Sequence, residues 1–217
     1  SRGELDKKSL VAGTVSLAGL ILSHNIMALM FLPIIAAYAI YLTWLSPHKL
    51  LAISYSLFTI LLGLGLSAFF LLPALLEKNL IRYDSILTGF YKTHFPSFWQ
   101  LFRSHWGYGF SHPGVAQDDM SFQVGLAHWL VIFMALIMPK VKHRWFFLSL
   151  FVASIFLMLE ISDPLWKTIP FLPYLQMPWR LLAVSVFAGS VLAAGLAAVF
   201  RPRWIMALVL SVAVLIA

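Results

Sequence analysis

Long apolar runs separated by short polar segments constrain the fold of this chain more than any other feature. Such runs fill residues 26–45, 50–76 and 181–200. A segment in lipid must satisfy its backbone hydrogen bonds internally, and a helix does so within itself. A β-barrel would require short strands of alternating polarity, whereas these runs are unbroken. Only 11% of the residues are charged, against roughly 25% in a soluble domain. We therefore predict an all-α fold, a polytopic transmembrane helical bundle.

Polar breaks divide the apolar sequence into about seven predicted spans. A single helix over 10–45 would be about 54 Å long, although the bilayer core is only about 30 Å thick. We therefore place a turn at His24 and Asn25. In the third span, Gly63 and Ser67 have the small-residue spacing that lets two helices approach closely. The predicted spans are 10–22, 26–45, 50–76, 122–138, 145–159, 181–200 and an incomplete run that begins at Trp204.

Both ends of the sequence suggest that it is part of a longer protein. The chain begins without a methionine, and its last apolar run has only 14 residues. A membrane span needs about 20. We expect residues 1–217 to form a single transmembrane domain fragment, truncated at both ends.

Basic residues are concentrated in the short connections on one predicted face of the membrane. Such residues mark the cytoplasmic side, so we predict a multi-pass protein of the cell membrane whose fragment begins in the cytoplasm. The outer loops are then about 77–121 and 160–179. The net charge of +7 needs no nucleic-acid partner, and the absence of cysteine excludes disulfides and thiolate metal sites. The basic residues of the cytoplasmic face are Arg2, Lys7, Lys8, Lys49, Lys140, Lys142, Arg144, Arg201 and Arg203.

An aromatic stripe runs through the first outer loop at helical spacing. The segment is too short to cross a bilayer, and we predict an interfacial amphipathic helix there. The stripe consists of Phe95, Phe98, Trp99, Phe102 and Trp106.

Arg180 is the most informative single residue in the sequence. It lies at the outer end of the sixth predicted span, where a lipid phosphate or diphosphate would lie, and its guanidinium offers a bidentate fork for one. The alternative is an interfacial arginine whose charge reaches the lipid headgroups.

Other polar residues near the predicted outer surface are also candidates. His24 and Asn25 could bind a phosphate or a sugar hydroxyl or help to hold a metal, or they could simply cap and close a turn. Glu77, Arg82 and Asp84 follow the third span and could supply a general base or a charge clamp. The alternative for these three residues is an ordinary interfacial position.

A divalent cation is a further possibility, although no cofactor is certain from the sequence. Carboxylates suit hard cations, so Asp118 and Asp119, with His112 six residues earlier, are the candidate ligands. The alternative is a solvated turn. His128 lies within an apolar span, and we predict that it packs against another helix.

Five short motifs follow one another along the chain. They are Leu22-Ser23-His24-Asn25, Phe69-Phe70-Leu71-Leu72-Pro73-Ala74-Leu75, Trp106-Gly107-Tyr108-Gly109, Ser121-Phe122-Gln123-Val124-Gly125 and Gln176-Met177-Pro178-Trp179-Arg180. In this order they resemble the motifs of a family of large bacterial and archaeal membrane proteins, the pyruvoyl-tetrahydropterin-synthase-related membrane domain. That family is similar to the YfhO-like proteins, and both resemble the GT-C class of glycosyltransferases. The resemblance covers nearly the whole chain and implies no pterin chemistry.

The resemblance implies transfer of a sugar from a polyprenyl-phosphate donor on the outer face of the membrane. Arg180 would contact the donor phosphate, with Gln176, His24, Asn25 and Arg82 among the substrate-binding residues. The acidic residue that serves as the catalytic base of such enzymes lies in a first outer loop, which would precede Ser1, and Glu77 and Asp84 are the candidates within this chain. The alternatives are a transporter or flippase of lipid-linked sugars, and a membrane protein without chemistry.

Overall fold

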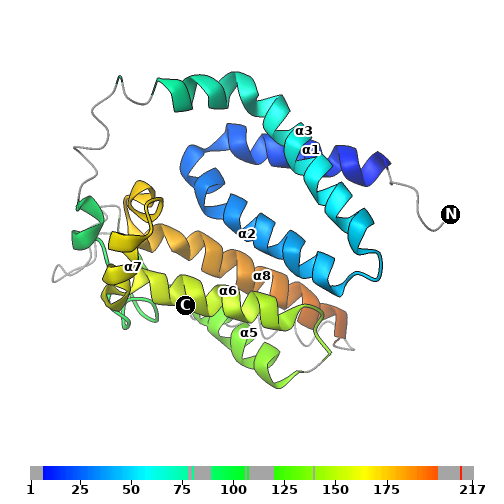
Figure 1. The fold of residues 1–217 in the computed structure, drawn as a ribbon. Coiled ribbons are helices and arrows are strands. Elements are labelled where there is room, and N and C mark those ends of the chain that lie inside the picture. Colours follow the sequence, from blue (N-terminus) through cyan, green and yellow to red (C-terminus); the bar gives the residue numbers. More distant parts are fainter. Residues whose placement is uncertain are drawn as a thin grey trace. The chain divides into compact units, whose positions relative to one another are not determined.

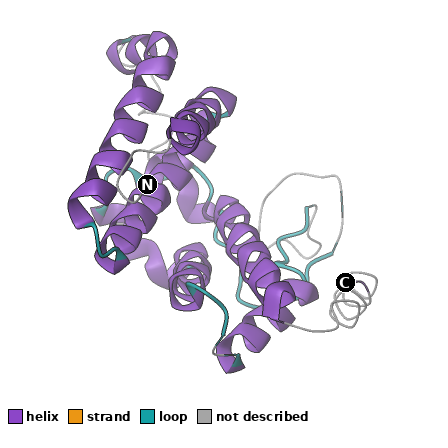
Figure 2. Cartoon of the chain, turned by 90° about the vertical axis from the view of Figure 1, so that its right-hand side faces the viewer, coloured by secondary structure: helices purple, strands orange, loops and turns teal. Residues whose placement is uncertain are grey.

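The computed structural model describes residues 7–77, 80, 89–105, 107, 120–138, 140–199 and 211. Within these ranges the chain consists of helices and connecting loops, with no strand (Figure 2). The prediction of an all-α fold is therefore confirmed for the described residues. They divide into two compact units, one within Ser1–Ile86 and the other within Leu87–Ala217.

The first unit contains three long helices, coloured blue to cyan in Figure 1. They are α1 (Lys7–Ser23), α2 (Asn25–Leu45) and α3 (Lys49–Leu76). The polar breaks in the sequence lie where these helices end, so the predicted turn at His24 is confirmed. The core of the unit contains Leu17, Ile21 and Ala28, with Leu32, Ile60, Phe70 and Leu71 packed against it.

Close packing between α1 and α3 depends on a glycine. A Cβ atom added to Gly63 would lie only 2.7 Å from Cδ2 of Leu17, whereas carbon atoms in contact prefer about 3.5–4.0 Å. Gly63 and Ser67 are both buried. The small-residue spacing predicted from the sequence therefore does bring two helices together.

The second unit contains α5 (Leu126–Ile137), α6 (Arg144–Met158), α7 (Asp163–Thr168) and α8 (Leu182–Val199). The helix α8 packs against both α5 and α6. A Cβ atom added to Gly189 of α8 would lie 2.7 Å from Cδ2 of His128. The prediction that His128 packs against another helix is therefore confirmed.

The described residues contain fewer candidate spans than the seven predicted. Three helices are long and apolar enough to cross a membrane: Asn25–Leu45, Lys49–Leu76 and Pro178–Val199. A fourth is possible if Arg144–Met158 and Glu160–Thr168, which are bent by 91° at a break, make one span. The helices α1 and α5 have only 17 and 12 residues, and a crossing needs about 20. The predicted seventh span, from Trp204, lies outside the described residues except for Ser211.

The predicted interfacial helix in the first outer loop is wrong for the part of the stripe that is described. Residues 98–102 form hydrogen-bonded turns, and no helix covers 95–105. Pro96 has no N–H group to donate within a helix. The carbonyl of Leu101 accepts from the Val124 backbone at 2.9 Å, and Ser104 Oγ accepts from the Phe122 N–H at 3.0 Å. The distant Val124 N–H therefore takes the Leu101 carbonyl, which a helix would have used for its own backbone.

The same hydrogen bonds correct the start of the fourth predicted span. The helix α5 begins at Leu126, four residues after the predicted start at Phe122. Phe122 and Val124 are buried in a non-helical segment, and their N–H groups bond to the preceding loop. Apolar composition could not distinguish a buried extended segment from the first turn of a helix.

Candidate functional site

Two loop segments of the second unit, 90–104 and 160–181, pack together through aromatic rings. We refer to them as the loop cluster. The Tyr91 ring stacks on Trp166 with the ring centroids 5.1 Å apart, and Phe95 meets Trp166 edge-on at 5.8 Å. Trp166 is fully buried, and its Nε1 donates to the Leu157 carbonyl at 3.0 Å. The aromatic packing therefore fixes the first segment on the short helix α7.

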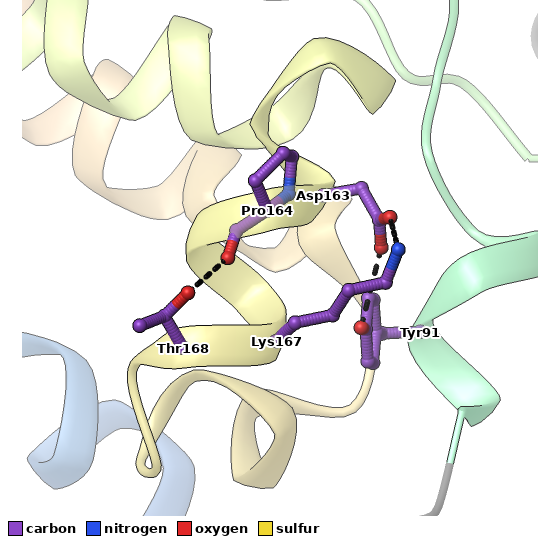
Figure 3. Close-up of polar contacts among 5 residues, drawn as sticks. All are labelled: Tyr91, Asp163, Pro164, Lys167 and Thr168. Carbon is purple, nitrogen blue, oxygen red and sulfur yellow. Dashed lines mark hydrogen bonds and ion pairs between the residues drawn. The ribbon is translucent and has the colours of Figure 1, made fainter.

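Tyr91 also takes part in a polar contact with two residues of α7, Asp163 and Lys167 (Figure 3). The Tyr91 hydroxyl donates to Oδ1 of Asp163 at 3.3 Å, and Lys167 forms an ion pair with the other oxygen of the same carboxylate. The hydrogen bond between Lys167 and Asp163 lowers the pKa of the Asp163 carboxylate. The same bond raises the pKa of the Lys167 amine. Burial, and then the charge of Asp163, raises the pKa of Tyr91.

Sequence reasoning did not identify this polar contact. The four-residue spacing of Asp163 and Lys167 could have predicted their ion pair on one face of a helix. The sequence gives no sign that Tyr91, 72 residues before Asp163, would join them.

The structure brings two of the predicted site residues into direct contact. Nη1 of Arg180 donates to Oε1 of Gln176 at 2.8 Å and to the carbonyl of Leu175 at 3.0 Å. Gln176 lies between two short 3₁₀ helices, Leu172–Leu175 and Pro178–Leu181, with a φ of 67°. This left-handed φ is uncommon for a residue with a side chain. The guanidinium is half-buried and held in place by these two bonds.

Trp179 lies beside Arg180 in the sequence and has an unusual polar atom. Its ring meets Phe122 edge-on, with the centroids 6.0 Å apart. Its Nε1 is buried and finds no hydrogen-bond acceptor among the described residues. Leaving a buried donor without an acceptor costs about 1–3 kcal/mol. A feature of this kind often marks a place where a ligand or water would bind.

The other described candidates belong to the first unit. Nδ1 of His24 accepts from the N–H of Ile26 at 3.1 Å, which makes His24 the N-cap of α2. Asn25 is the first residue of that helix, and both side chains are exposed. This geometry matches the capping role that the sequence left open, and substrate contact at His24 and Asn25 stays a prediction. Glu77 caps the carboxyl end of α3 and is exposed.

The remaining candidates lie outside the described residues. They are Arg82, Asp84, His112, Asp118 and Asp119. Within the described ranges, no group of three or more His, Asp or Glu side chains could hold a metal ion. A divalent cation bound by His112, Asp118 and Asp119 therefore stays a prediction.

Comparison of the chain with models of known families, with curated proteins and with solved structures gave no match.

Proposed function

We propose that this chain is part of an integral-membrane glycosyltransferase of the GT-C type, which takes its sugar from a polyprenyl-phosphate donor on the extracytoplasmic face. Arg180 carries the proposal. It lies near the beginning of the candidate span Pro178–Val199. A polyprenyl donor keeps its phosphate where the lipid chain enters the membrane, which is the level expected for a residue at the end of a span.

The way Arg180 is held also supports a phosphate-binding role. A guanidinium fits phosphate oxygens through two parallel hydrogen bonds. The bonds to Gln176 and Leu175 orient the guanidinium before any ligand arrives. Less side-chain entropy is then lost when the ligand binds.

The indole N–H of Trp179 is a second donor at the same turn. It is buried and has no acceptor among the described residues. An anionic oxygen that reached it would relieve the cost of the unsatisfied donor. A cation and a neutral donor on adjacent residues are a suitable pair for a phosphate diester.

Sugar transfer also needs a carboxylate that takes a proton from the acceptor. Glu77 and Asp84 remain the candidates for this role. Glu77 is exposed at the end of α3, so water or an acceptor hydroxyl can reach it.

A transporter or flippase of lipid-linked sugars is the second candidate. Transporters often contain interrupted helices whose ends line the substrate site. The 91° bend between Arg144–Met158 and Glu160–Thr168 is the observation that favours this alternative. A membrane protein without chemistry remains a third possibility.

One assay separates these functions. The intact protein would be reconstituted in vesicles and given a radiolabelled polyprenyl-phosphate sugar with a mixture of acceptors. Incorporation of label into an acceptor supports the transferase, and movement across the bilayer without incorporation supports the transporter. If neither occurs, both proposals fail. The variant Arg180→Ala should lose the activity, whereas Arg144→Ala should keep it, because Arg144 packs over the Trp145 ring in a basic connection.

The proposal also requires a particular orientation, with residue Ser1 on the cytoplasmic side. Since the chain has no cysteine, Lys167→Cys and Lys142→Cys would each carry the only thiol. A membrane-impermeant maleimide added to intact cells should label position 167 and not position 142. The reverse pattern would contradict the proposed orientation.

A further inference from the structure

Three aromatic rings project from one turn of the loop cluster. Trp99 is 77% exposed, Phe98 47% and Phe102 39%. The rings contact one another: the centroids of Phe98 and Phe102 are 5.1 Å apart, and those of Phe98 and Trp99 are 5.9 Å apart. We refer to residues 97–103 as the aromatic turn. Several large apolar side chains exposed together mark an interaction surface.

The backbone of the aromatic turn is fixed by its own hydrogen bonds. The N–H of Ser97 donates to Oε1 of Gln100 at 2.8 Å, and the N–H of Gln100 donates back to Oγ of Ser97 at 3.3 Å. This reciprocal pair has the form of a capping box. Leu101 is completely buried beneath the turn. Leu101 is the residue of this turn that points into the core, so the rings of Phe98, Trp99 and Phe102 remain exposed.

The aromatic turn is also tied to the apolar helix α5. The ring of Phe102 stacks on Trp129, with the centroids 4.2 Å apart and the planes within 8°. The carbonyl of Leu101 accepts from the Val124 N–H at 2.9 Å and from Nε1 of Trp129 at 3.4 Å. The turn therefore continues the surface of an apolar helix and keeps its position relative to it.

The chemistry of the aromatic turn fits a lipid surface better than a protein partner. Trp and Phe settle at the boundary between headgroups and acyl chains. Arg103 follows the rings and is exposed, and a guanidinium at that level can reach lipid phosphates. Candidate membrane spans occur in the same chain. A bilayer surface is therefore within reach of a turn that is attached to α5.

We infer that the aromatic turn inserts Phe98, Trp99 and Phe102 into the lipid headgroup region as a preformed wedge, with Arg103 on lipid phosphates. The wedge fixes the depth of the loop cluster in the membrane. This inference does not depend on the chemistry proposed for Arg180. It assigns to a compact turn the membrane contact that the sequence suggested for a helix.

Site-directed spin labelling tests the wedge directly, because the chain has no cysteine of its own. The variants Trp99→Cys and Phe98→Cys, each labelled with a nitroxide, would be studied in nanodiscs of phosphatidylcholine and phosphatidylglycerol. Collision with oxygen, which concentrates in lipid, would be compared with collision with a water-soluble nickel complex. We expect oxygen to dominate at positions 98 and 99 by about threefold or more, reflecting the steep change in polarity across the interface.

The matched control is Lys92→Cys, at an exposed position of the 3₁₀ helix Phe90–Thr93 in the same segment. There the nickel complex should dominate. Nickel dominance at 98 and 99 would show an aqueous turn and would overturn the inference. Collision with neither reagent would show that protein covers the rings, either a second copy or another part of the chain, and would overturn it equally. Two labelled positions guard against one variant failing to fold.

Discussion

The hydroxyl oxygens of Ser154 on α6 and Ser185 on α8 lie 2.7 Å apart in a buried contact between the two helices. Each hydroxyl also lies within hydrogen-bond distance of a nearby carbonyl, that of Phe151 on α6 at 2.8 Å for Ser154 and that of Leu181, just before α8, at 3.4 Å for Ser185. The two hydroxyl protons serve three contacts, so the serine that donates across to the other helix does so in place of its local carbonyl bond, and the pair connects the two helices.

Replacing either serine by alanine should weaken the contact between α6 and α8 by about 0.6 kcal/mol, and by at most about 1.7 kcal/mol, the range found for such bonds in membrane proteins. Ser154→Ala, Ser185→Ala and the double variant would be compared by unfolding in mixed detergent micelles. The double variant should cost less than the sum of the two single variants. Strict additivity would show that the bond contributes nothing to stability.

The packing of α1 on α3 supplies a second prediction with a matched control on the same helix. Gly63→Ala would place Cβ 2.7 Å from Leu17, and overpacking of this kind costs about 1–3 kcal/mol. Gly65→Ala meets nothing within 4 Å, and alanine favours helix over glycine by about 1 kcal/mol. The first variant should lower the free energy of unfolding and the second should leave it unchanged or raise it. Equal effects would contradict the packing.

A third prediction concerns the N-cap of α2. His24→Ala removes the acceptor of the Ile26 N–H and should cost about 1 kcal/mol. His24→Asn should retain most of the stability, since asparagine is a good N-cap. Asn25→Ala, one residue further along, is the control for a general effect at this turn. If His24→Asn kept the stability but abolished binding of the polyprenyl-phosphate sugar, His24 would contact the substrate in addition to capping the helix.

A fourth prediction separates the orientation of Arg180 from its charge. Gln176→Gly removes the amide that accepts from Arg180, and glycine tolerates the φ of 67° at this position. Losing one hydrogen bond of about 1 kcal/mol should weaken binding of a polyprenyl phosphate roughly fivefold. Arg180→Gln should weaken it further, and Arg144→Gln should have no effect. Calorimetric titration in detergent would measure the three affinities.

A fifth prediction follows from the ion pair of Asp163 and Lys167. The pKa of Asp163 is lowered from its ordinary value of 3.8, so its contribution is complete above that value and is lost as the pH falls through the lowered pKa. The pKa of Lys167 is raised from 10.5, so its contribution is complete below 10.5 and is lost as the pH rises through the raised pKa.

The melting temperature of Asp163→Asn should therefore lie below that of the unmodified chain by a constant amount between about pH 5 and pH 9. The difference should shrink as the pH falls below 3.8. Thermal unfolding in detergent across this range measures it. A difference that did not change with pH would mean that the carboxylate charge has no role.

The sequence was sufficient to predict the helices of the first unit. Each of them is an apolar run that ends at a polar break, and Gly63 with Ser67 marked the close contact. These features depend on local composition and spacing, which a sequence displays directly. The helices of the first unit can therefore be predicted from the local sequence alone.

The loop cluster could not be predicted in the same way. The spacing of the aromatic residues fits a helix, but Phe95 packs on Trp166 and Leu101 bonds to Val124, both of which are distant in the sequence. Tertiary partners of this kind override local periodicity. The position of Arg180 at the end of a predicted span marks it as a candidate. Its bond to Gln176, however, depends on a positive φ at Gln176, and a glutamine does not predict such a φ.

The Leu101 carbonyl, which receives hydrogen from both Val124 and the Trp129 indole, has a mechanical consequence. One oxygen atom joins the aromatic turn to α5 itself, through Trp129, and to the segment that leads into α5, through Val124. A force that pulled α5 out of its surroundings would load this junction at once, so helix and turn should come away in one step.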